Sequence, residues 1–81
     1  MKLDNKTQPL IRLYTTSACH LCELAEALLQ DANLTAESIE IANEDALVLR
    51  YGVRIPVIKR LDTQAELDWP FTSQDILLFM Q

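Results

Sequence analysis

Apolar and polar residues alternate along the chain in a pattern that predicts seven regular elements. Short apolar or alternating runs are typical of strands, because successive strand side chains point to opposite faces. They predict strands over residues 10–14, 38–42, 57–61 and 65–69. Apolar residues spaced three and four apart are typical of helices that pack on one side, and they predict helices over residues 19–31, 44–51 and 74–80. The order β-α-β-α-β-β-α indicates an α/β fold, a four-stranded mixed sheet with helices on both faces.

The predicted helices have recognisable ends and buried faces. Residues 15–17, Thr-Thr-Ser, are turn and N-cap formers before the first helix. Gly52, the only glycine, follows the second helix, where a left-handed C-cap is expected. Thr72 and Asp75 have the spacing of a capping box at the start of the third helix. The side chains expected to be buried are Leu21, Leu24, Ala25, Leu28 and Leu29 in the first helix, and Ile76, Leu77, Phe79 and Met80 in the last.

Length, charge and the N-terminal residues restrict the class of protein. The 81 residues, 49% of them apolar, predict one domain over residues 9–81, preceded by a flexible tail over residues 1–8. The formal net charge of −5 argues against binding to nucleic acid and against attraction to an anionic membrane. No stretch approaches the roughly 20 apolar residues of a membrane span, and the polar start lacks the apolar centre of a secretory signal. We therefore expect a cytoplasmic protein.

The candidate chemistry lies in the only two cysteines, Cys19 and Cys22, between a predicted strand and a predicted helix. A helix N-terminus carries partial positive charge, which favours a thiolate at the first cysteine. The second lies one turn further on, within reach of a mixed disulfide formed by the first. A disulfide across two intervening residues restricts the unfolded chain little, so the spacing favours a functional bond over a structural one.

Other interpretations of this segment stay open. Structural zinc usually has four ligands, and the chain has two cysteines and one histidine. We therefore expect no metal site within one chain, although a dimer sharing a metal ion or an iron–sulfur cluster is an alternative, and inert thiols are another. His20 would lower the pKa of Cys19 if its imidazole were charged; otherwise it is an exposed helix residue. Glu23 and Glu26 would act in the opposite direction, or merely solubilise the helix.

Three segments, together with the order of the elements, carry a resemblance to a known family. They are Cys19-His20-Leu21-Cys22, Arg50-Tyr51-Gly52-Val53-Arg54-Ile55-Pro56-Val57 and Glu66-Leu67-Asp68-Trp69-Pro70-Phe71. Over residues 10–80 the chain resembles the thioredoxin fold in its minimal, glutaredoxin-like form. It is most similar to small bacterial glutaredoxin-like proteins of poorly defined role.

The resemblance implies roles for particular residues. Cys19 would attack a substrate disulfide and Cys22 would resolve the mixed disulfide, leaving a redox-active disulfide between them. Pro56 would follow a cis peptide bond and lie against the cysteine pair, while Ile55 would offer its backbone N–H and C=O to an extended substrate. No cofactor is implied. We expect a monomer whose partner is a protein or small-molecule disulfide.

The sequence departs from glutaredoxins that use glutathione. Thr16 stands where they typically have lysine, Arg54-Ile55 replaces Thr-Val, and residues 69–73 lack their Gly-Gly element. Glutathione stays a candidate partner. Arg54 is a candidate substrate-facing cation in place of the missing lysine, and the alternative interpretation is a surface salt bridge.

These observations lead to one main hypothesis and one from another class. The main hypothesis is a cytoplasmic thiol–disulfide oxidoreductase that uses Cys19 and Cys22. The alternative is a binding or scaffold module of the same fold, in which a groove beside Pro56 holds a protein segment and the thiols are incidental.

Overall fold

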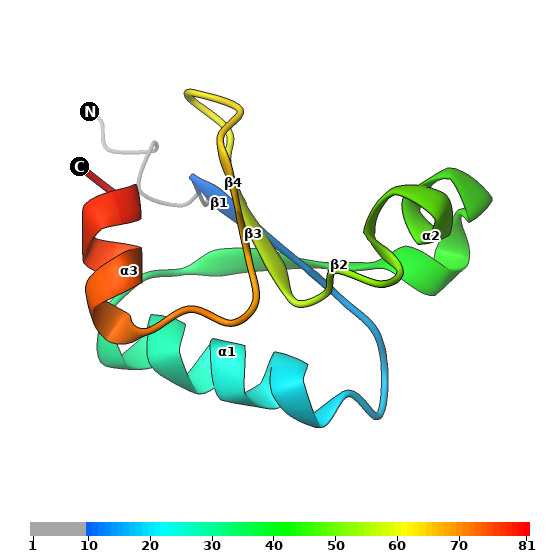
Figure 1. The fold of residues 1–81 in the computed structure, drawn as a ribbon, viewed down its shortest axis with the longest axis horizontal. Coiled ribbons are helices and arrows are strands. Elements are labelled where there is room, and N and C mark those ends of the chain that lie inside the picture. Colours follow the sequence, from blue (N-terminus) through cyan, green and yellow to red (C-terminus); the bar gives the residue numbers. More distant parts are fainter. Residues whose placement is uncertain (1–9) are drawn as a thin grey trace, which may run out of the picture.

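Residues 10–81 are described by a computed structural model, and the predicted tail over residues 1–8 lies outside the described residues. The sheet consists of β1 (Ile11–Thr15), β2 (Ala36–Glu40), β3 (Val57–Arg60) and β4 (Glu66–Asp68). Its strand order is β2-β1-β3-β4 (Figure 1). Strand β2 is parallel to β1, whereas β3 is antiparallel to β1 and β4 is antiparallel to β3. The predicted four-stranded mixed sheet is confirmed.

Three α-helices alternate with the strands in the predicted order. They are α1 (His20–Asp31), α2 (Asp45–Tyr51) and α3 (Ser73–Phe79), and a short 3-10 helix, η2 (Ile41–Asn43), follows β2. The predicted capping box of α3 is present, because Asp75 N donates to Thr72 Oγ1 (3.1 Å) and Thr72 N donates to Asp75 Oδ2 (2.9 Å). None of the helices in residues 10–81 is long and apolar enough to cross a membrane.

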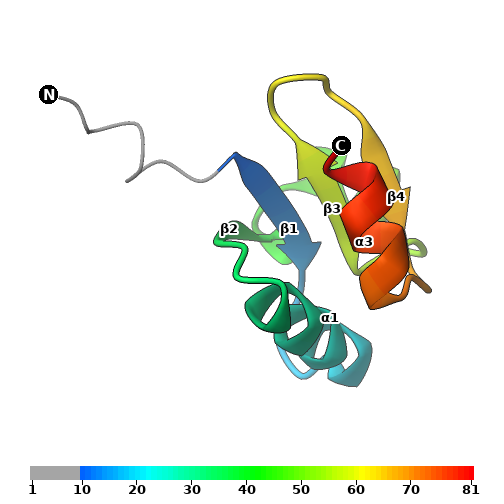
Figure 2. The same ribbon diagram turned by 90° about the vertical axis from the view of Figure 1, so that its left-hand side faces the viewer.

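The sheet is covered on both faces. Successive side chains of β1 point to opposite faces and so belong to different cores. Ile11 and Leu13 pack with residues of α1 and α3 in one core cluster, whereas Tyr14 packs with Tyr51 of α2 in a second. Figures 1 and 2 show α1 and α3 on one side of the sheet and α2 on the other. Each face of the sheet therefore has its own small core.

Three details of the sequence prediction are wrong at the level of single residues. Leu21 and Leu24 are 44% and 42% exposed, because the buried stripe of α1 is centred on Cys22, Ala25 and Leu29 and leaves both leucines at its edge. Leu77 of α3 is 60% exposed, because α3 turns Ile76 to the core instead. These leucines are apolar residues at helix positions that the sheet does not reach.

The second strand and the glycine also differ from the prediction. Strand β2 spans 36–40 and not 38–42, since Glu40 caps η2 by accepting a hydrogen bond from Ala42 N (3.1 Å) and so ends the strand. Gly52 has φ −52° and ψ −40°, which is right-handed helical backbone and no left-handed cap. A Cβ at Gly52 would lie 2.5 Å from the Val48 carbonyl oxygen. Glycine is therefore required there for close backbone approach.

Candidate functional site

The strand pairing brings three separate segments to one edge of the sheet. Strand β3 is antiparallel to β1, with Tyr14 opposite Val57, so the residues after β1 lie beside Ile55 and Pro56, which precede β3. Strand β2 is parallel to β1, with Thr15 opposite Glu40, so both strands end at this same edge. The loop that carries Cys19 therefore lies between the end of β2 and the start of β3.

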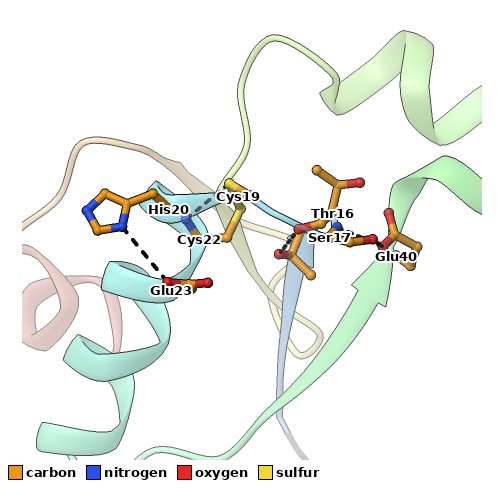
Figure 3. The surroundings of a disulfide bond; sticks show 8 residues. Thr16, Ser17, Cys19, His20, Cys22, Glu23 and Glu40 are labelled. Atoms are coloured by element: carbon orange, nitrogen blue, oxygen red, sulfur yellow. Dashed lines mark hydrogen bonds and ion pairs between the residues drawn. A yellow bond between two sulfur atoms is a disulfide. The ribbon is translucent and has the colours of Figure 1, made fainter.

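The two cysteines are joined by a disulfide at the start of α1 (Figure 3). Their Cα atoms are 5.2 Å apart. Cys22 is buried, with 1% of its surface exposed, whereas Cys19 is only partly buried. Of the two sulfur atoms, solvent or a substrate therefore has better access to that of Cys19.

Cys19 is itself the N-cap of α1, and the N-cap expected within residues 15–17 is two to four positions too early. Its backbone is extended (φ −108°, ψ 104°), and its Sγ accepts a hydrogen bond from Cys22 N (3.1 Å). An N-cap position is surrounded by the unpaired N–H groups of the first helical turn. Once the disulfide is reduced, these groups and the helix dipole favour the thiolate form of Cys19.

His20 is the residue predicted to tune Cys19. Its side chain is 79% exposed, and Nδ1 lies 3.9 Å from Glu23 Oε1. Figure 3 shows the imidazole directed away from both sulfur atoms. The contact in this structure is with a carboxylate on the next turn, and the effect of His20 on the thiol stays a prediction.

Ile55 and Pro56 lie at the edge of the sheet where the Cys19 loop begins. The Ile55–Pro56 peptide bond is cis, and so is Trp69–Pro70. Pro56 is less than 2% exposed, and its carbonyl accepts a hydrogen bond from Trp69 N (3.1 Å). The N–H of Ile55, expected to face a substrate, instead donates to the Tyr51 carbonyl (3.0 Å). Substrate contact by either residue stays a prediction, and the Ile55 N–H is already used within the protein.

Arg54 is bound by carboxylates of β4. Its guanidinium donates from Nε and Nη2 to the two oxygens of Asp68 (2.9 and 2.8 Å) and from Nη2 to Glu66 Oε1 (2.6 Å). A fourth hydrogen bond goes from Nη1 to the Arg50 carbonyl (3.3 Å). These contacts correspond to the salt-bridge interpretation, and a substrate-facing role for Arg54 would require the guanidinium to give up some of these partners.

Tyr51 completes this network on the α2 face of the sheet. Its ring stacks on Tyr14 with centroids 4.0 Å apart, and its hydroxyl donates to Glu66 Oε2 (2.7 Å). Burial and the hydrogen bond to Glu66 raise the pKa of Tyr51, so its hydroxyl stays protonated. Burial alone would raise the pKa of Glu66, but the hydrogen bonds from Tyr51 and Arg54 outweigh it and the pKa is lowered. The network therefore contains a neutral tyrosine and an ionised carboxylate.

Glu40 is a residue at the site that the sequence reasoning missed. Its Oε1 accepts hydrogen bonds from Ser17 N (3.1 Å) and Ser17 Oγ (3.2 Å), two residues before Cys19. Its position in the sequence could have indicated this contact, because Glu40 ends a strand whose parallel neighbour leads into the cysteine loop. Parallel neighbours end at the same edge of a sheet, so a polar residue at that position is a candidate for contact with the loop.

The described residues contain no cluster of metal-binding side chains, and their open depression lies away from the cysteines. Within residues 10–81 no group of three or more His, Cys, Asp and Glu side chains is arranged to hold a metal ion, and a metal shared in a dimer stays a prediction. An open depression of about 300 Å³ lies between α1 and β2. Its lining residues include Leu13, Leu29 and Ser38 but neither cysteine. The cysteine site is thus separate from this depression.

Comparisons with known proteins agree with this geometry. Residues 10–80 match the family model described as "Glutaredoxin-like domain (DUF836)". A crystal structure of structural genomics target protein XcR50 from X. campestris is 35% identical, with a TM-score of 0.80 over 86% of this chain and 93% of that chain. A solution structure of the same target is 33% identical, with a TM-score of 0.79 over 88% of this chain and 91% of that chain. No curated protein matches significantly.

Proposed function

The chain belongs to the family of glutaredoxin-like domains, and from that premise we propose that it is a thiol–disulfide oxidoreductase in which Cys19 is the nucleophile and Cys22 the resolving thiol. The observation that carries the proposal is the pairing of a partly exposed Cys19 with a buried Cys22 in one disulfide at a helix N-terminus. Attack requires access and thiolate character. A substrate can reach the partly exposed Cys19, and the N-terminus of α1 favours its thiolate form. Cys22 is buried and shielded from such attack.

The proposed reaction passes two electrons from the dithiol to a substrate disulfide. The Cys19 thiolate attacks one substrate sulfur, the substrate S–S bond breaks, and the first substrate thiolate leaves. Cys22 then loses its proton and attacks Cys19 Sγ, which releases the second substrate thiolate and forms the Cys19–Cys22 bond. The substrate is reduced to two thiols, and the protein is left as its disulfide. One dithiol or two monothiols of the cell must return two electrons before the next cycle, and they are oxidised to a disulfide in doing so.

Replacing each cysteine tests this division of roles. With Cys19→Ser, we expect the rate of reduction of a small aromatic disulfide, followed by its coloured thiolate, to fall by at least about 100-fold because the nucleophile is missing. With Cys22→Ser, attack still occurs but stops at a mixed disulfide, which mass spectrometry should find on Cys19. Gln30→Ala, at an exposed position near the other end of α1, serves as a control that keeps both thiols and their loop. A Cys19→Ser protein as active as the wild type would contradict the proposal.

The partner and the compartment belong to the proposal as well. We propose a protein or small-molecule disulfide as substrate, no nucleic acid or membrane partner, a monomeric protein and a cytoplasmic location. Glutathione is tested by equilibrating the protein with defined ratios of its reduced and oxidised forms. Formation of a glutathione adduct on Cys19 in the Cys22→Ser variant would support glutathione as a partner. If no adduct forms, proteins and other thiols remain as the candidate partners.

A binding module of the same fold is the second candidate, favoured by one observation. Val53 and Leu49 are 101% and 88% exposed near the segment that leads to Pro56, and apolar side chains that gather in an exposed patch are typical of contact surfaces. The pKa of Cys19 in the reduced protein separates the two candidates. A value near the ordinary thiol value of about 8.5, with no disulfide under mild oxidation, would favour the module.

A further inference from the structure

We propose that Glu40 is a positioning residue for Cys19: its carboxylate fixes the loop before α1 and thereby favours the Cys19–Cys22 disulfide over the dithiol. The inference rests on the proposed function, because it concerns how readily the same cysteine pair exchanges electrons. It adds a residue from another element, since Glu40 belongs to β2 and neither cysteine does.

The contacts of Glu40 join three backbone segments through one side chain. Oε1 accepts from both the N–H and the hydroxyl of Ser17 (3.1 and 3.2 Å), and Oε2 accepts from Ala42 N (3.1 Å). Figure 3 shows the carboxylate directed at Ser17, with Thr16 beside it. The loop is therefore attached to the end of β2, which is itself held against β1 by the parallel pairing of Thr15 with Glu40.

The loop requires such an attachment because its backbone is strained. Ala18, between Ser17 and Cys19, has φ of 57°, in the left-handed region that residues with a Cβ rarely adopt. Strained backbone persists only where the surrounding structure holds it. Ser17 is held by Glu40 on one side of Ala18, and Cys19 is held on the other by its hydrogen bond from Cys22 N.

The charge state of Glu40 agrees with this role. The nearby Thr16 side chain and the hydrogen bonds from Ala42 N and Ser17 lower the pKa of Glu40. The carboxylate is thus ionised at neutral pH and can accept all of these hydrogen bonds at once. A neutral amide at the same position could not, because its NH₂ group donates only.

A fixed loop has a direct consequence for the cysteine pair. Disulfide formation depends on how often Cys19 Sγ lies within bonding reach of Cys22 Sγ. Cys22 is buried within α1, so this frequency depends on the loop that carries Cys19. If Glu40 is removed, the dithiol form gains freedom at Ser17 and Ala18, and the disulfide becomes easier to reduce.

The experiment measures the equilibrium of the Cys19–Cys22 pair with reduced and oxidised dithiothreitol, by trapping free thiols at a series of ratios. Each disulfide formed in the protein reduces one oxidised dithiothreitol, so atoms and electrons balance. We expect Glu40→Ala to lower the equilibrium constant for disulfide formation about five- to tenfold. We expect Glu40→Gln, which keeps one acceptor oxygen, to give an intermediate value.

Asp75→Ala provides the matched control. Like Glu40, Asp75 accepts a backbone hydrogen bond next to a helix, but it is an exposed residue that caps α3. We expect Asp75→Ala to lower the stability of the protein while leaving the dithiothreitol equilibrium within about twofold of the wild type. If Glu40→Ala leaves the constant unchanged or raises it, or if Asp75→Ala lowers it equally, the inference is overturned.

Failure of this inference and failure of the proposed function give different results. The equilibrium with dithiothreitol measures the stability of the Cys19–Cys22 disulfide without any biological substrate. A wild-type protein that equilibrates with dithiothreitol but reduces no other disulfide would contradict the proposed function, and the Glu40 comparison would still decide the present inference. A wild-type pair that forms no disulfide at all would overturn both.

Discussion

The ring and the hydroxyl of Tyr51 have different roles. Its ring is 2% exposed and stacks on Tyr14, so it fills the core on the α2 face. Its hydroxyl reaches Glu66 of β4, and the guanidinium of Arg54 lies over the ring at 5.1 Å from the centroid. A cation over an aromatic face is attracted by the quadrupole of the ring, whose face is partially negative although the ring is neutral. The residue therefore joins apolar packing to the ion-pair network that holds the segment before Pro56.

The substitution Tyr51→Phe separates these two purposes. The ring stack is kept and only the hydrogen bond to Glu66 is lost. Glu66 retains Arg54 at 2.6 Å and Arg50 at 3.5 Å, so no carboxylate is left without a partner. We expect the free energy of unfolding in urea to fall by about 1 kcal/mol, the ordinary net value of one hydrogen bond, with an unchanged m-value. A loss above about 3 kcal/mol would show that the hydroxyl does more than this single bond.

Single residues were predictable from the sequence where the signal is local. Cys19 and Cys22 are recognised by their spacing, and Thr72 with Asp75 by the capping pattern, because the partners are three residues apart. The contacts of Glu40 with Ser17 and of Tyr51 with Glu66 span 23 and 15 residues. No local sequence pattern predicts these contacts, because they depend on which strands become neighbours in the sheet.

Helix α2 shows how an element can end for a reason other than its sequence pattern suggests. A glycine after a helix usually supplies left-handed backbone. Here the backbone remains helical, Gly52 N donates to the Val48 carbonyl (2.8 Å), and the chain then turns through Arg54 and Ile55 toward β3. The two further N–H groups that donate to the Tyr51 carbonyl tighten this turn. The absence of a side chain permits the close approach.

The substitution Gly52→Ala tests this explanation through the sign of its effect. At an ordinary helical position, alanine is more favourable than glycine by roughly 1 kcal/mol. At Gly52 the added Cβ would meet a backbone oxygen at 2.5 Å, and relieving such an overlap typically costs about 1–3 kcal/mol. We expect a lower midpoint of thermal unfolding. Ala27→Gly, at an exposed position of α1, calibrates the propensity effect alone, and a stabilised Gly52→Ala protein would refute the explanation.

For the whole molecule, Glu66 connects parts of the chain that are distant in sequence. From β4 it contacts Arg50 and Tyr51 of α2 and Arg54 of the following loop. Its side chain is 16% exposed, so solvent screens these contacts less than those of a surface pair. The network therefore fastens α2, the segment before Pro56 and the β3–β4 hairpin to one another.

The lowered pKa of Glu66 predicts how the stability of the protein depends on pH. A carboxyl with a lower pKa in the folded than in the unfolded state contributes stability that is complete above the unfolded value, about 4.3. This contribution is lost as the pH falls through the folded value. We expect Glu66→Gln to be less stable than the wild type at pH 7 and the difference to narrow below about pH 4. The measurement is urea unfolding at pH 7, 5, 4 and 3, and a difference that stays constant with pH would contradict it.

The order of elements followed from the pattern of apolar residues, and the arrangement of strands did not. Alternation in residues 65–69 and stripes in residues 19–31 indicate strand or helix without reference to the rest of the chain. The sheet order depends on which strand pairs with β1 on each side, and those partners lie in residues 36–40 and 57–60. Periodicity shows which face of an element is buried and does not identify the neighbouring element, so the strand order came only with the structure.

Strand β1 has neighbours on both sides, and this has a consequence for how the protein is made. The ribosome releases residues 11–15 early, but their second partner strand ends only at residue 60. During that interval one row of β1 backbone groups lacks its final partner, and an unpaired edge invites pairing with other chains. A chain in which β3 has not yet paired with β1 is therefore exposed to aggregation or to chaperone capture along this row.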